Sequence, residues 1–470
     1  MASSREGQRQ PNIPKGSYLQ EETVNPWGIE EVPSSSPART EELTREARYD
    51  HLMEQVVERN NLLQALYRVE RNKGAAGVDG MAIKSLRSFI VNNWTRIRDE
   101  LLNGNYQPLP VRRVEIPKPD GGIRLLGIPT VLDRLIQQAL LQVLTPIFDP
   151  KFSPLSFGFR RGYSAHQAVK QAQNFIRQGF RFVVDMDLEK FFDRVNHDIL
   201  MSKLAKKIED KRILKLIRRY LQAGIMVNGV CIASDEGTPH GGPLSPLLAN
   251  IMLDALDKEL LKRGHRFVRY ADDCNIYVKS RRAGERVLEG VKEFVEKRLK
   301  LKVNMEKSSV DRPWKRKFLG FSFTNNRDPR LRLAPKTVKR FKDKVRELTS
   351  RSRSQSMENR IQSLNVYLQG WGGYFRLADT RSVFQSLDEW TRRRLRMCLL
   401  KQWKKPKTKR KNMISLGIPR EWATLISSSR KGYWRLSNSP QINKALGIAY
   451  WQKQGLKSLV ERFDAFRFTT

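Results

Sequence analysis

Apolar side chains recur every three or four residues from about Glu41 to Val69, which predicts an amphipathic helix. A second segment of the same kind runs from about Ile83 to Leu102. The glycine-rich stretch between them, residues 72–80, predicts a turn because glycine adopts positive φ angles without strain. The first fifty residues mix Pro, Ser, Glu and Gly without periodicity, so we predict a flexible tail there.

After residue 110 the pattern changes to the alternation of apolar and polar residues that is typical of strands. Two strands around a turn come first (residues 111–117 and 123–129), followed by a helix (131–148). An apolar strand that ends in acids (182–187) and a second hairpin (266–279) come later. The first hairpin carries Lys118 and Arg124 near its tip. Because helices alternate with antiparallel strands, we predict an α+β core, followed from about Val338 by a basic and helical region.

Basic residues far outnumber acidic ones: 88 Lys and Arg against 49 Asp and Glu give a formal net charge of +39. The excess lies outside the first fifty residues and is densest from Arg392 to Lys411, where eleven residues are basic and none is acidic. A solvated surface is the usual interpretation of a short basic run. For an excess of this size we predict a nucleic-acid partner, because each ion-paired Lys or Arg releases condensed counterions from phosphates.

Cysteines and apolar runs narrow the class of protein further. The three cysteines, Cys231, Cys274 and Cys398, lie too far apart for a disulfide framework or a zinc ribbon. No apolar run is long enough to predict a membrane span, and the polar N-terminus has no apolar segment typical of a secretory signal. We therefore expect a cytoplasmic protein, associated with the nucleoid if its host is a bacterium.

Three carboxylates lie at the ends of apolar strands. Asp187 ends the first of these strands, and Asp272 and Asp273 occupy the turn of the later hairpin. Such acids repel one another and lose hydration, and a bound divalent cation relieves both costs. Two cations about 4 Å apart would activate a primer 3′-hydroxyl and stabilise the leaving pyrophosphate. A solvated turn is the alternative for the adjacent pair alone. Asp185 shares the strand face of Asp187, so spacing does not exclude it as a ligand.

Seven stretches in a fixed order resemble the reverse transcriptases encoded by group II introns, in particular the bacterial class that lacks a nuclease domain. The stretches are residues 71–80, 116–119, 156–160, 185–193, 237–250, 270–273 and 318–321. Each alone is weakly specific, whereas several in the right order are strong evidence. The similarity covers the chain from about residue 51 to the C-terminus.

The resemblance implies an α+β right-hand polymerase with fingers and palm, followed by an all-helical thumb and a small helical C-terminal domain. The implied parts are a flexible tail (residues 1–50), an N-terminal extension (51–110), fingers and palm (111–335), a thumb or maturase domain (336–415) and a DNA-binding segment (416–470). Members of this class copy an RNA template into cDNA from a DNA primer and dNTPs. They also bind group II intron RNA to assist splicing and retrohoming, and they contact target DNA. No membrane partner is implied.

The resemblance also assigns roles to single residues. Asp187, Asp272 and Asp273 would be the catalytic residues and would ligate two Mg²⁺ ions, with Mn²⁺ able to substitute. Five residues would contact the incoming dNTP: Lys118, Arg124, Phe192, His240 and Lys307. Seven would contact the template or other RNA: Gly74, Gly77, Arg160, Arg392, Arg393, Arg394 and Lys404.

Some assignments have a simpler alternative. The ring of Phe192 would fill the space that a ribose 2′-hydroxyl needs, whereas a core aromatic is the alternative. His240 stands where the family usually has Gln, which predicts altered fidelity or pH dependence. Other histidines, including His166 and His197, have no clustered partners, and we expect structural roles for them. Two other functions stay open: a splicing cofactor without polymerase activity, and a non-mobile or domesticated maturase that acts in DNA repair.

Overall fold

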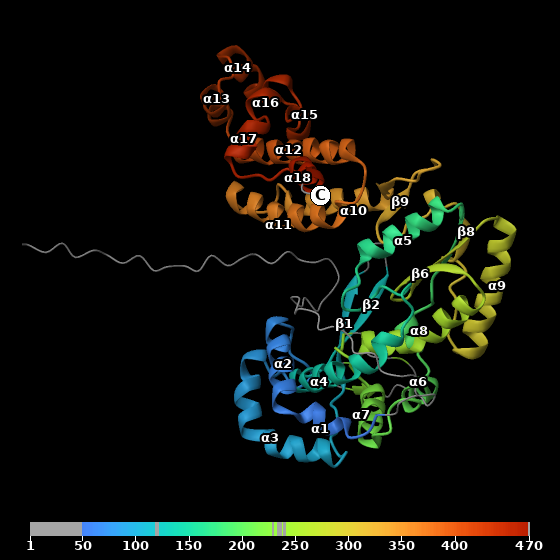
Figure 1. The fold of residues 1–470 in the computed structure, drawn as a ribbon. Helices are drawn as coiled ribbons and strands as arrows, with labels where there is room; N and C mark the ends of the chain where they lie inside the picture. The colour runs from blue at the N-terminus through green and yellow to red at the C-terminus, as the bar shows by residue number, and fades with distance from the viewer. Residues whose placement is uncertain (1–48, 118–121, 228–229, 233–236, 238–240, 469–470) are drawn as a thin grey trace, which may run out of the picture. The chain divides into compact units, whose positions relative to one another are not determined.

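The computed structural model describes residues 49–117, 122–227, 230–232, 237 and 241–468. They belong to two compact units, a larger one within residues 25–344 and 377–380 and a smaller one within residues 345–376 and 381–470. The larger unit combines helices with small sheets, whereas every regular element described wholly within the smaller unit is a helix (Figure 1). The predicted order, a mixed α/β domain followed by a helical one, is therefore confirmed. Residues 1–48, Lys118 and His240 lie outside the described residues.

Helices α1 (Leu52–Val57) and α2 (Arg59–Arg71) pack on α4 (Val131–Phe148). Helix α3 (Leu86–Leu102) packs on α1. The expected single helix up to Val69 is wrong at Glu58, where α1 ends and α2 begins. The Glu58 backbone is extended, and its carboxylate accepts hydrogen bonds from the backbone N–H groups of Asn60 and Asn61, each at 2.9 Å. Glu58 is the N-cap of α2. Hydrophobic periodicity does not reveal such a break, because the apolar spacing continues across it.

The first predicted hairpin is confirmed, because β1 (Val111–Pro117) pairs antiparallel with β2 (Ile123–Ile128). Its sheet is extended by a parallel partner, β4 (Ile225–Val227), which pairs in turn with β5 (Val230–Ile232). Helix α4 starts directly after β2, where the Thr130 hydroxyl accepts the backbone N–H of Asp133 at 3.0 Å.

A second sheet, with strand order β6-β7-β3-β8, carries the predicted catalytic acids. Its strands are antiparallel to their neighbours: β3 (Phe182–Met186), β6 (Arg266–Tyr270), β7 (Asp273–Val278) and β8 (Ser309–Asp311). Two helices, α8 (Ser245–Lys262) and α9 (Arg281–Arg298), contact this sheet, and their apolar residues share one core with Val184 and Ile276. Because successive strand residues alternate between faces, Asp185 and Asp187 lie on the opposite face.

The opposite face is covered at one end by α5 (Ala165–Arg177). The rings of Phe175 on α5 and Tyr277 on β7 lie 5.8 Å apart between centroids. At the other end of β7, Asp273 is exposed. The remaining elements of the larger unit are helices and short strands: α6 (His197–Ala205), α7 (Lys211–Gln222), β9 (Phe321–Phe323) and β10 (Leu331–Leu333). Helix α10 (Pro335–Leu348) contains the boundary between the units.

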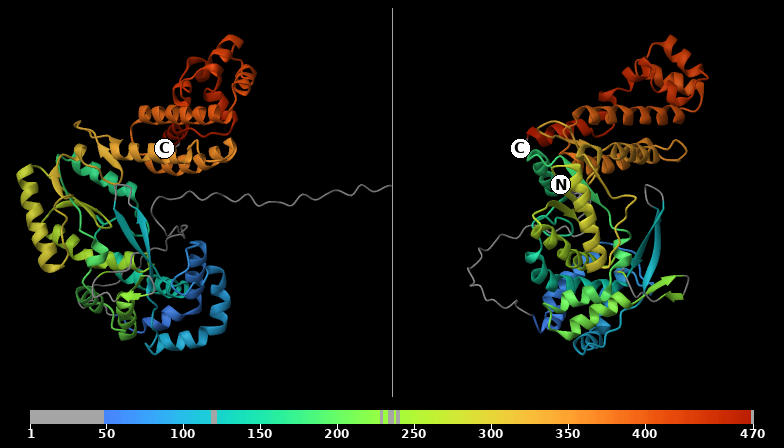
Figure 2. Two further views of the ribbon diagram at one scale, coloured as in Figure 1. Left: turned by 180° about the vertical axis from the view of Figure 1, so that it is seen from behind. Right: turned by 90° about the vertical axis from the view of Figure 1, so that its right-hand side faces the viewer.

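The smaller unit is built on two long helices, α11 (Met357–Phe375) and α12 (Arg381–Gln402), which Figure 2 shows from two further directions. Helix α18 (Leu459–Phe468) contacts both of them. Shorter helices complete the unit: α13 (Pro406–Ser415), α14 (Arg420–Ser428), α15 (Tyr433–Leu436), α16 (Pro440–Ala445) and α17 (Ile448–Lys453). None of the helices in the described ranges combines the length and apolar character that a bilayer crossing requires.

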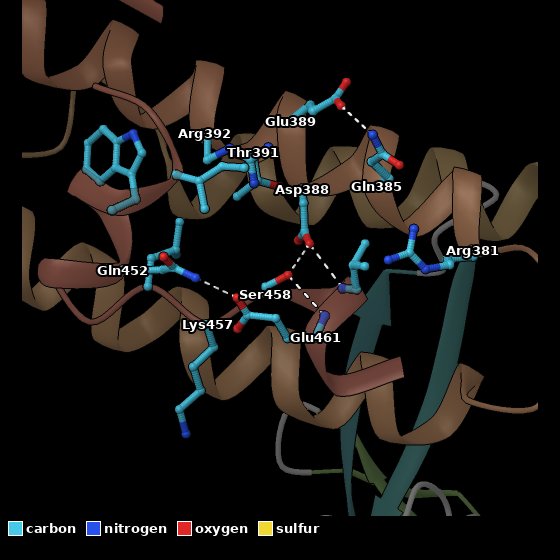
Figure 3. Close-up of a pocket in the computed structure, with 14 residues that line it drawn as sticks. Arg381, Gln385, Asp388, Glu389, Thr391, Arg392, Gln452, Lys457, Ser458 and Glu461 are labelled. Atoms are coloured by element: carbon cyan, nitrogen blue, oxygen red, sulfur yellow. Dashed lines mark hydrogen bonds between the residues drawn. The ribbon is translucent and has the colours of Figure 1, made fainter. Parts of the chain in front are cut away.

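A buried carboxylate joins α12 to the start of α18. Asp388 accepts hydrogen bonds from the Ser458 hydroxyl at 2.7 Å and from the backbone N–H groups of Leu459 and Val460 at 3.0 and 3.1 Å (Figure 3). These bonds satisfy amide groups at a helix N-terminus that have no partner within the helix. A pocket of about 350 Å³ lies beside this junction and is lined from α12, α17 and the start of α18.

Candidate active site

Asp187 and Asp273 lie opposite each other at the ends of two paired strands. Met186 pairs with Cys274 in the antiparallel register of β3 and β7, and one further residue along each strand brings Asp187 to Asp273. Opposite residues of such a pair hold their β-carbons about 4.5–5.5 Å apart. The Ser308 hydroxyl accepts the Asp187 backbone N–H at 3.0 Å and holds this strand end in place. Two acids that are distant in sequence therefore share one end of the sheet.

The turn between β6 and β7 presents Asp272 beside that pair. Tyr270 pairs with Asp273, so the turn consists of Ala271 and Asp272. Ala271 has a φ of 58°, a left-handed conformation that is uncommon for residues other than glycine and needs support from its surroundings. Gly158 provides a close contact there, because a β-carbon at this position would overlap the backbone nitrogen of Ala271.

A fully buried arginine supports the same turn. Nη1 of Arg269 donates to the carbonyl of Ala271 at 2.8 Å and to Oδ1 of Asn250 at 3.0 Å. The Asn250 amide in turn donates to the carbonyl of Gly158 at 2.9 Å. Asp257 on α8 neutralises Arg269 through two hydrogen bonds of 2.6 and 2.7 Å. These contacts connect the Ser-Phe-Gly-Phe-Arg motif, α8 and the turn between β6 and β7.

Arg269 and Asp257 were not among the predicted site residues, although the sequence carries a signal for both. Arg269 follows Phe267 by two positions in a strand, so both side chains belong to the same, buried face. Asp257 falls within the apolar stripe of α8 that contains Leu253 and Leu260. Because a buried charge requires a partner, an arginine and an aspartate at such positions predict an ion pair.

The surroundings of Asp273 raise its pKa. Burial is the main cause that raises the pKa of Asp273 to about 7, and the negative charges of the three neighbouring aspartates act in the same direction. The Asp273 side chain reaches solvent, but the surrounding protein is close enough to weaken its hydration. A cation also lies nearby, since Nζ of Lys307 is 3.7 Å from Oδ2 of Asp187.

Asp185, which the strand spacing left open as a ligand, already has a cation. Arg316 donates to Oδ2 of Asp185 from Nε at 2.9 Å and from Nη2 at 2.6 Å. Burial raises the pKa of Asp185, and the charge of Arg316 opposes that rise. A carboxylate held by a guanidinium is less available to a metal ion, so this geometry favours Asp187 as the ligand on β3.

The donor set fits a hard divalent cation. Aspartate oxygens are the ligands that Mg²⁺ prefers, and this ion usually takes only one or two carboxylates together with water and substrate phosphates. Within the described ranges, no group of three or more His, Cys, Asp or Glu side chains is arranged so that it could hold a metal ion. The paired strand ends bring Asp187 and Asp273 together, and the resemblance adds Asp272 from the adjoining turn.

The predicted dNTP-contact residues are only partly described. Phe192 lies in the 3₁₀ turn Phe191–Arg194 just after Asp187, is 8% exposed, and meets the ring of Phe191 edge-on with centroids 5.0 Å apart. Arg124 lies in β2, where it pairs with Ile116. The side chain of Arg124 is outside the described parts of the chain, as are Lys118 and His240. Their roles stay predictions.

The glycine-rich loop before α3 packs directly on the start of α4. A β-carbon at Gly77 would lie 2.5 Å from Cα of Thr130, which leaves no room for a side chain. A β-carbon at Gly74 would overlap the guanidinium of Arg134, and this guanidinium also donates to the carbonyl of Ala75. Packing against backbone explains Gly77, whereas the neighbour of Gly74 is the end of a flexible side chain that can move. The template contact predicted for both glycines stays a prediction.

Arg160 was predicted to contact RNA, but the structure engages it internally. Its guanidinium pairs with Asp149 at 2.8 Å and donates to the carbonyls of Ser153 and Ser156 at 2.7 and 2.9 Å. It also lies 4.1 Å from the ring centroid of Tyr163, and the residue is only 5% exposed. This position gives Arg160 a structural role beneath the motif and does not support the expected template contact.

The other predicted RNA contacts lie in the smaller unit. Arg393 stacks 3.9 Å from the ring centroid of Trp434, and Arg394 donates to the hydroxyl of Thr349 at 2.9 Å. Arg392 lines the pocket beside α18 (Figure 3). Lys404 is exposed. Lys404 is therefore the member of this set that is most accessible to a phosphate, while the three arginines are half-buried.

Comparisons with known proteins show the family to which this chain belongs. The family model described as reverse transcriptase (RNA-dependent DNA polymerase) matches residues 116–323. The chain thus contains a reverse transcriptase domain, and this domain includes the paired strands and the acidic turn. A second model, described as the group II intron maturase-specific domain, matches residues 338–416. The chain belongs to the group II intron reverse transcriptase/maturase family.

Individual relatives support this membership. The chain is 36% identical over 279 residues to Protein YkfC of Escherichia coli (strain K12), a match that covers 51% of this chain and 73% of YkfC. It is 39% identical over 199 residues to the group II intron-encoded protein LtrA of Lactococcus lactis subsp. cremoris, covering 42% of this chain but only 33% of LtrA. A solved chain of the Partial Cas6-RT-Cas1--Cas2 complex is 28% identical, with a TM-score of 0.35, over 52% of this chain and 42% of that one.

Proposed function

We propose that this chain copies RNA into DNA and that the acidic end of the β3–β7 pair is its catalytic centre. The observation that carries the proposal is the strand register that brings Asp187 to Asp273, with Asp272 in the adjoining turn. The reaction joins a primer 3′-hydroxyl to the α-phosphate of a dNTP and releases pyrophosphate, and it depends on position and charge rather than on covalent help from the protein.

The acids and their neighbours have different roles in the proposed reaction. Bound Mg²⁺, two ions per site and replaceable by Mn²⁺, would supply activation of the hydroxyl and neutralisation of the phosphates. Asp187, Asp272 and Asp273 would hold these ions. Lys307 lies close enough to Asp187 to meet the phosphates of a bound nucleotide. Phe192 restricts the sugar to deoxyribose, and three further residues contact the nucleotide: Lys118, Arg124 and His240.

We further propose that the smaller unit binds group II intron RNA and thereby assists splicing and retrohoming. The match to the maturase-specific model and the basic stretch from Arg392 to Lys411, which contains no acidic residue, support this proposal. The segment from residue 416 to 470 is assigned to target DNA. In the larger unit, the proposed N-terminal extension ends at residue 110 and the fingers and palm end at residue 335.

Primer extension on an RNA template tests the first proposal, and splicing of a group II intron RNA tests the second. Asp272→Ala and Asp273→Ala are expected to abolish cDNA synthesis while RNA affinity stays close to that of the unchanged protein, because basic residues elsewhere hold the RNA. Full extension by either variant would overturn the catalytic assignment. A protein that promotes splicing but never extends a primer would instead be a splicing cofactor.

A further inference from the structure

The backbone of Gly237 forms hydrogen bonds with the segment that follows strand β3. Its N–H donates to the carbonyl of Val195 at 2.8 Å. Its carbonyl lies 2.6 Å from Nε2 of His197, a side chain that is only 4% exposed. Because a carbonyl can only accept, Nε2 of His197 carries the proton and donates it. A buried group thus fixes one end of the Gly-Thr-Pro-His-Gly-Gly motif.

Gly237 also touches the turn that carries Phe192. A β-carbon at Gly237 would lie 3.0 Å from the carbonyl oxygen of Phe192 and 3.1 Å from Cα of Asp193. Such distances are tighter than ordinary van der Waals contact, so the two backbones are packed as closely as a glycine allows. Gly237 has a φ of +98°, which only glycine adopts readily. A displacement of Gly237 is therefore expected to displace the turn that carries Phe192.

The far end of the motif is seated on other elements of the larger unit. A β-carbon at Gly241 would lie 2.7 Å from the carbonyl oxygen of Gly127 in β2. At Gly242 it would overlap the side-chain oxygen of Gln137 on α4. One end of the motif thus rests on the Phe192 turn and the other on β2 and α4. At the first end, the described contacts include a side-chain hydrogen bond from a histidine.

We infer that His197 is a positioning residue that sets the discrimination between deoxyribose and ribose, acting through Gly237 on the turn that carries Phe192. This inference rests on the proposed role of Phe192 in sugar selection. Loss of the Nε2–H donor leaves the buried Gly237 carbonyl unsatisfied, so the glycine moves toward another donor and releases its contact with the turn. A small displacement of the Phe192 ring then opens space where a 2′-hydroxyl would otherwise clash.

The experiment measures kcat/KM for a dNTP and for the matching rNTP on the same primer and RNA template. His197→Leu, which removes the donor, is expected to raise the rNTP-to-dNTP ratio by about three- to tenfold, the factor that one hydrogen bond contributes. His197→Gln, whose amide can still donate, is expected to restore much of the selectivity. His265→Gln is the matched control, because His265 lies outside these contacts, in the connection between α8 and β6.

Three outcomes separate the inference from simpler roles. A purely structural histidine would lower thermal stability and both kcat/KM values together, with an unchanged ratio, and that result would overturn the inference. If His197→Leu does not fold, His197→Asn supplies the same test, because its shorter side chain stays polar but does not reach Gly237.

Phe192→Val distinguishes the proposed role of Phe192 in sugar selection from the proposed role of His197 in positioning it. If it leaves the ratio unchanged, the role of Phe192 fails; if it raises the ratio while His197→Leu does not, only the role of His197 fails.

Discussion

Arg269 and Asp257 form a fully buried ion pair next to the turn between β6 and β7. Both side chains have no exposed surface, and the two hydrogen bonds between them measure 2.6 and 2.7 Å. A third donor of Arg269 reaches the carbonyl of Ala271. The pair therefore couples α8 to the residue whose strained backbone presents Asp272 and Asp273.

Removal of Asp257 is expected to destabilise the larger unit strongly. Asp257→Ala leaves the Arg269 charge buried without a partner, and such a change costs about 3–5 kcal/mol in free energy of unfolding. Chemical denaturation with increasing urea measures this loss. Glu293→Ala is the control, because it removes an exposed pair with Lys297 and is expected to cause no measurable change. An Asp257→Ala protein as stable as the unchanged one would refute the importance of the pair.

Gly158→Ala is expected to impair catalysis more than folding. The added methyl group would overlap the Ala271 backbone and push the turn away from Asp187. A misplacement of about 1 Å at a reacting centre costs on the order of 10²-fold in rate. Single-turnover primer extension measures the rate, and thermal melting measures the folded fraction. Gly432→Ala provides the comparison, because nothing lies near the position of its β-carbon. Equal rates for the two variants would contradict the proposed support of the turn.

The sequence predicted the positions of the acids at the strand ends better than the contacts that support them. Asp187 and Asp273 each end an apolar strand, and this local pattern survives in a single sequence. The parallel pairing of β1 with β4 depends on a contact between distant segments, which local periodicity does not encode. Arg160 shows what a motif does not reveal. Its position in a family motif suggested RNA, whereas burial and internal acceptors show that a basic residue in a motif can serve packing.

Alkaline pH is expected to destabilise the larger unit through Tyr106. Burial, and then the charge of Asp133, raise the pKa of Tyr106 far above its ordinary value of 10. The unfolded chain ionises this phenol near pH 10 and the folded chain does not, so its contribution to stability is complete below pH 10 and is lost as pH rises above it. The loss is about 1.4 kcal/mol per pH unit. Denaturation between pH 8 and 11 measures it.

Tyr106→Phe separates this effect from general alkaline damage. The variant loses the 2.9 Å hydrogen bond to Asp133 and is expected to be less stable at pH 8. Its stability should then fall less steeply above pH 10, since one phenol no longer ionises in the unfolded chain. Parallel curves for the variant and the unchanged protein would show that Tyr106 does not govern the alkaline loss.

Salt-dependent RNA binding distinguishes Arg160 from Lys404. Each phosphate contact that a protein makes contributes about 0.7 to 0.9 to the slope of log affinity against log salt concentration. Lys404→Gln removes an exposed cation from the basic run and is expected to reduce the slope by nearly one contact. Arg160→Met is expected to lower thermal stability but to leave the slope of the folded protein unchanged, because its guanidinium is held by Asp149 and backbone carbonyls. Fluorescence anisotropy with a labelled RNA gives both slopes. If the slope falls for Arg160→Met instead, the arginine contacts RNA as its motif first suggested.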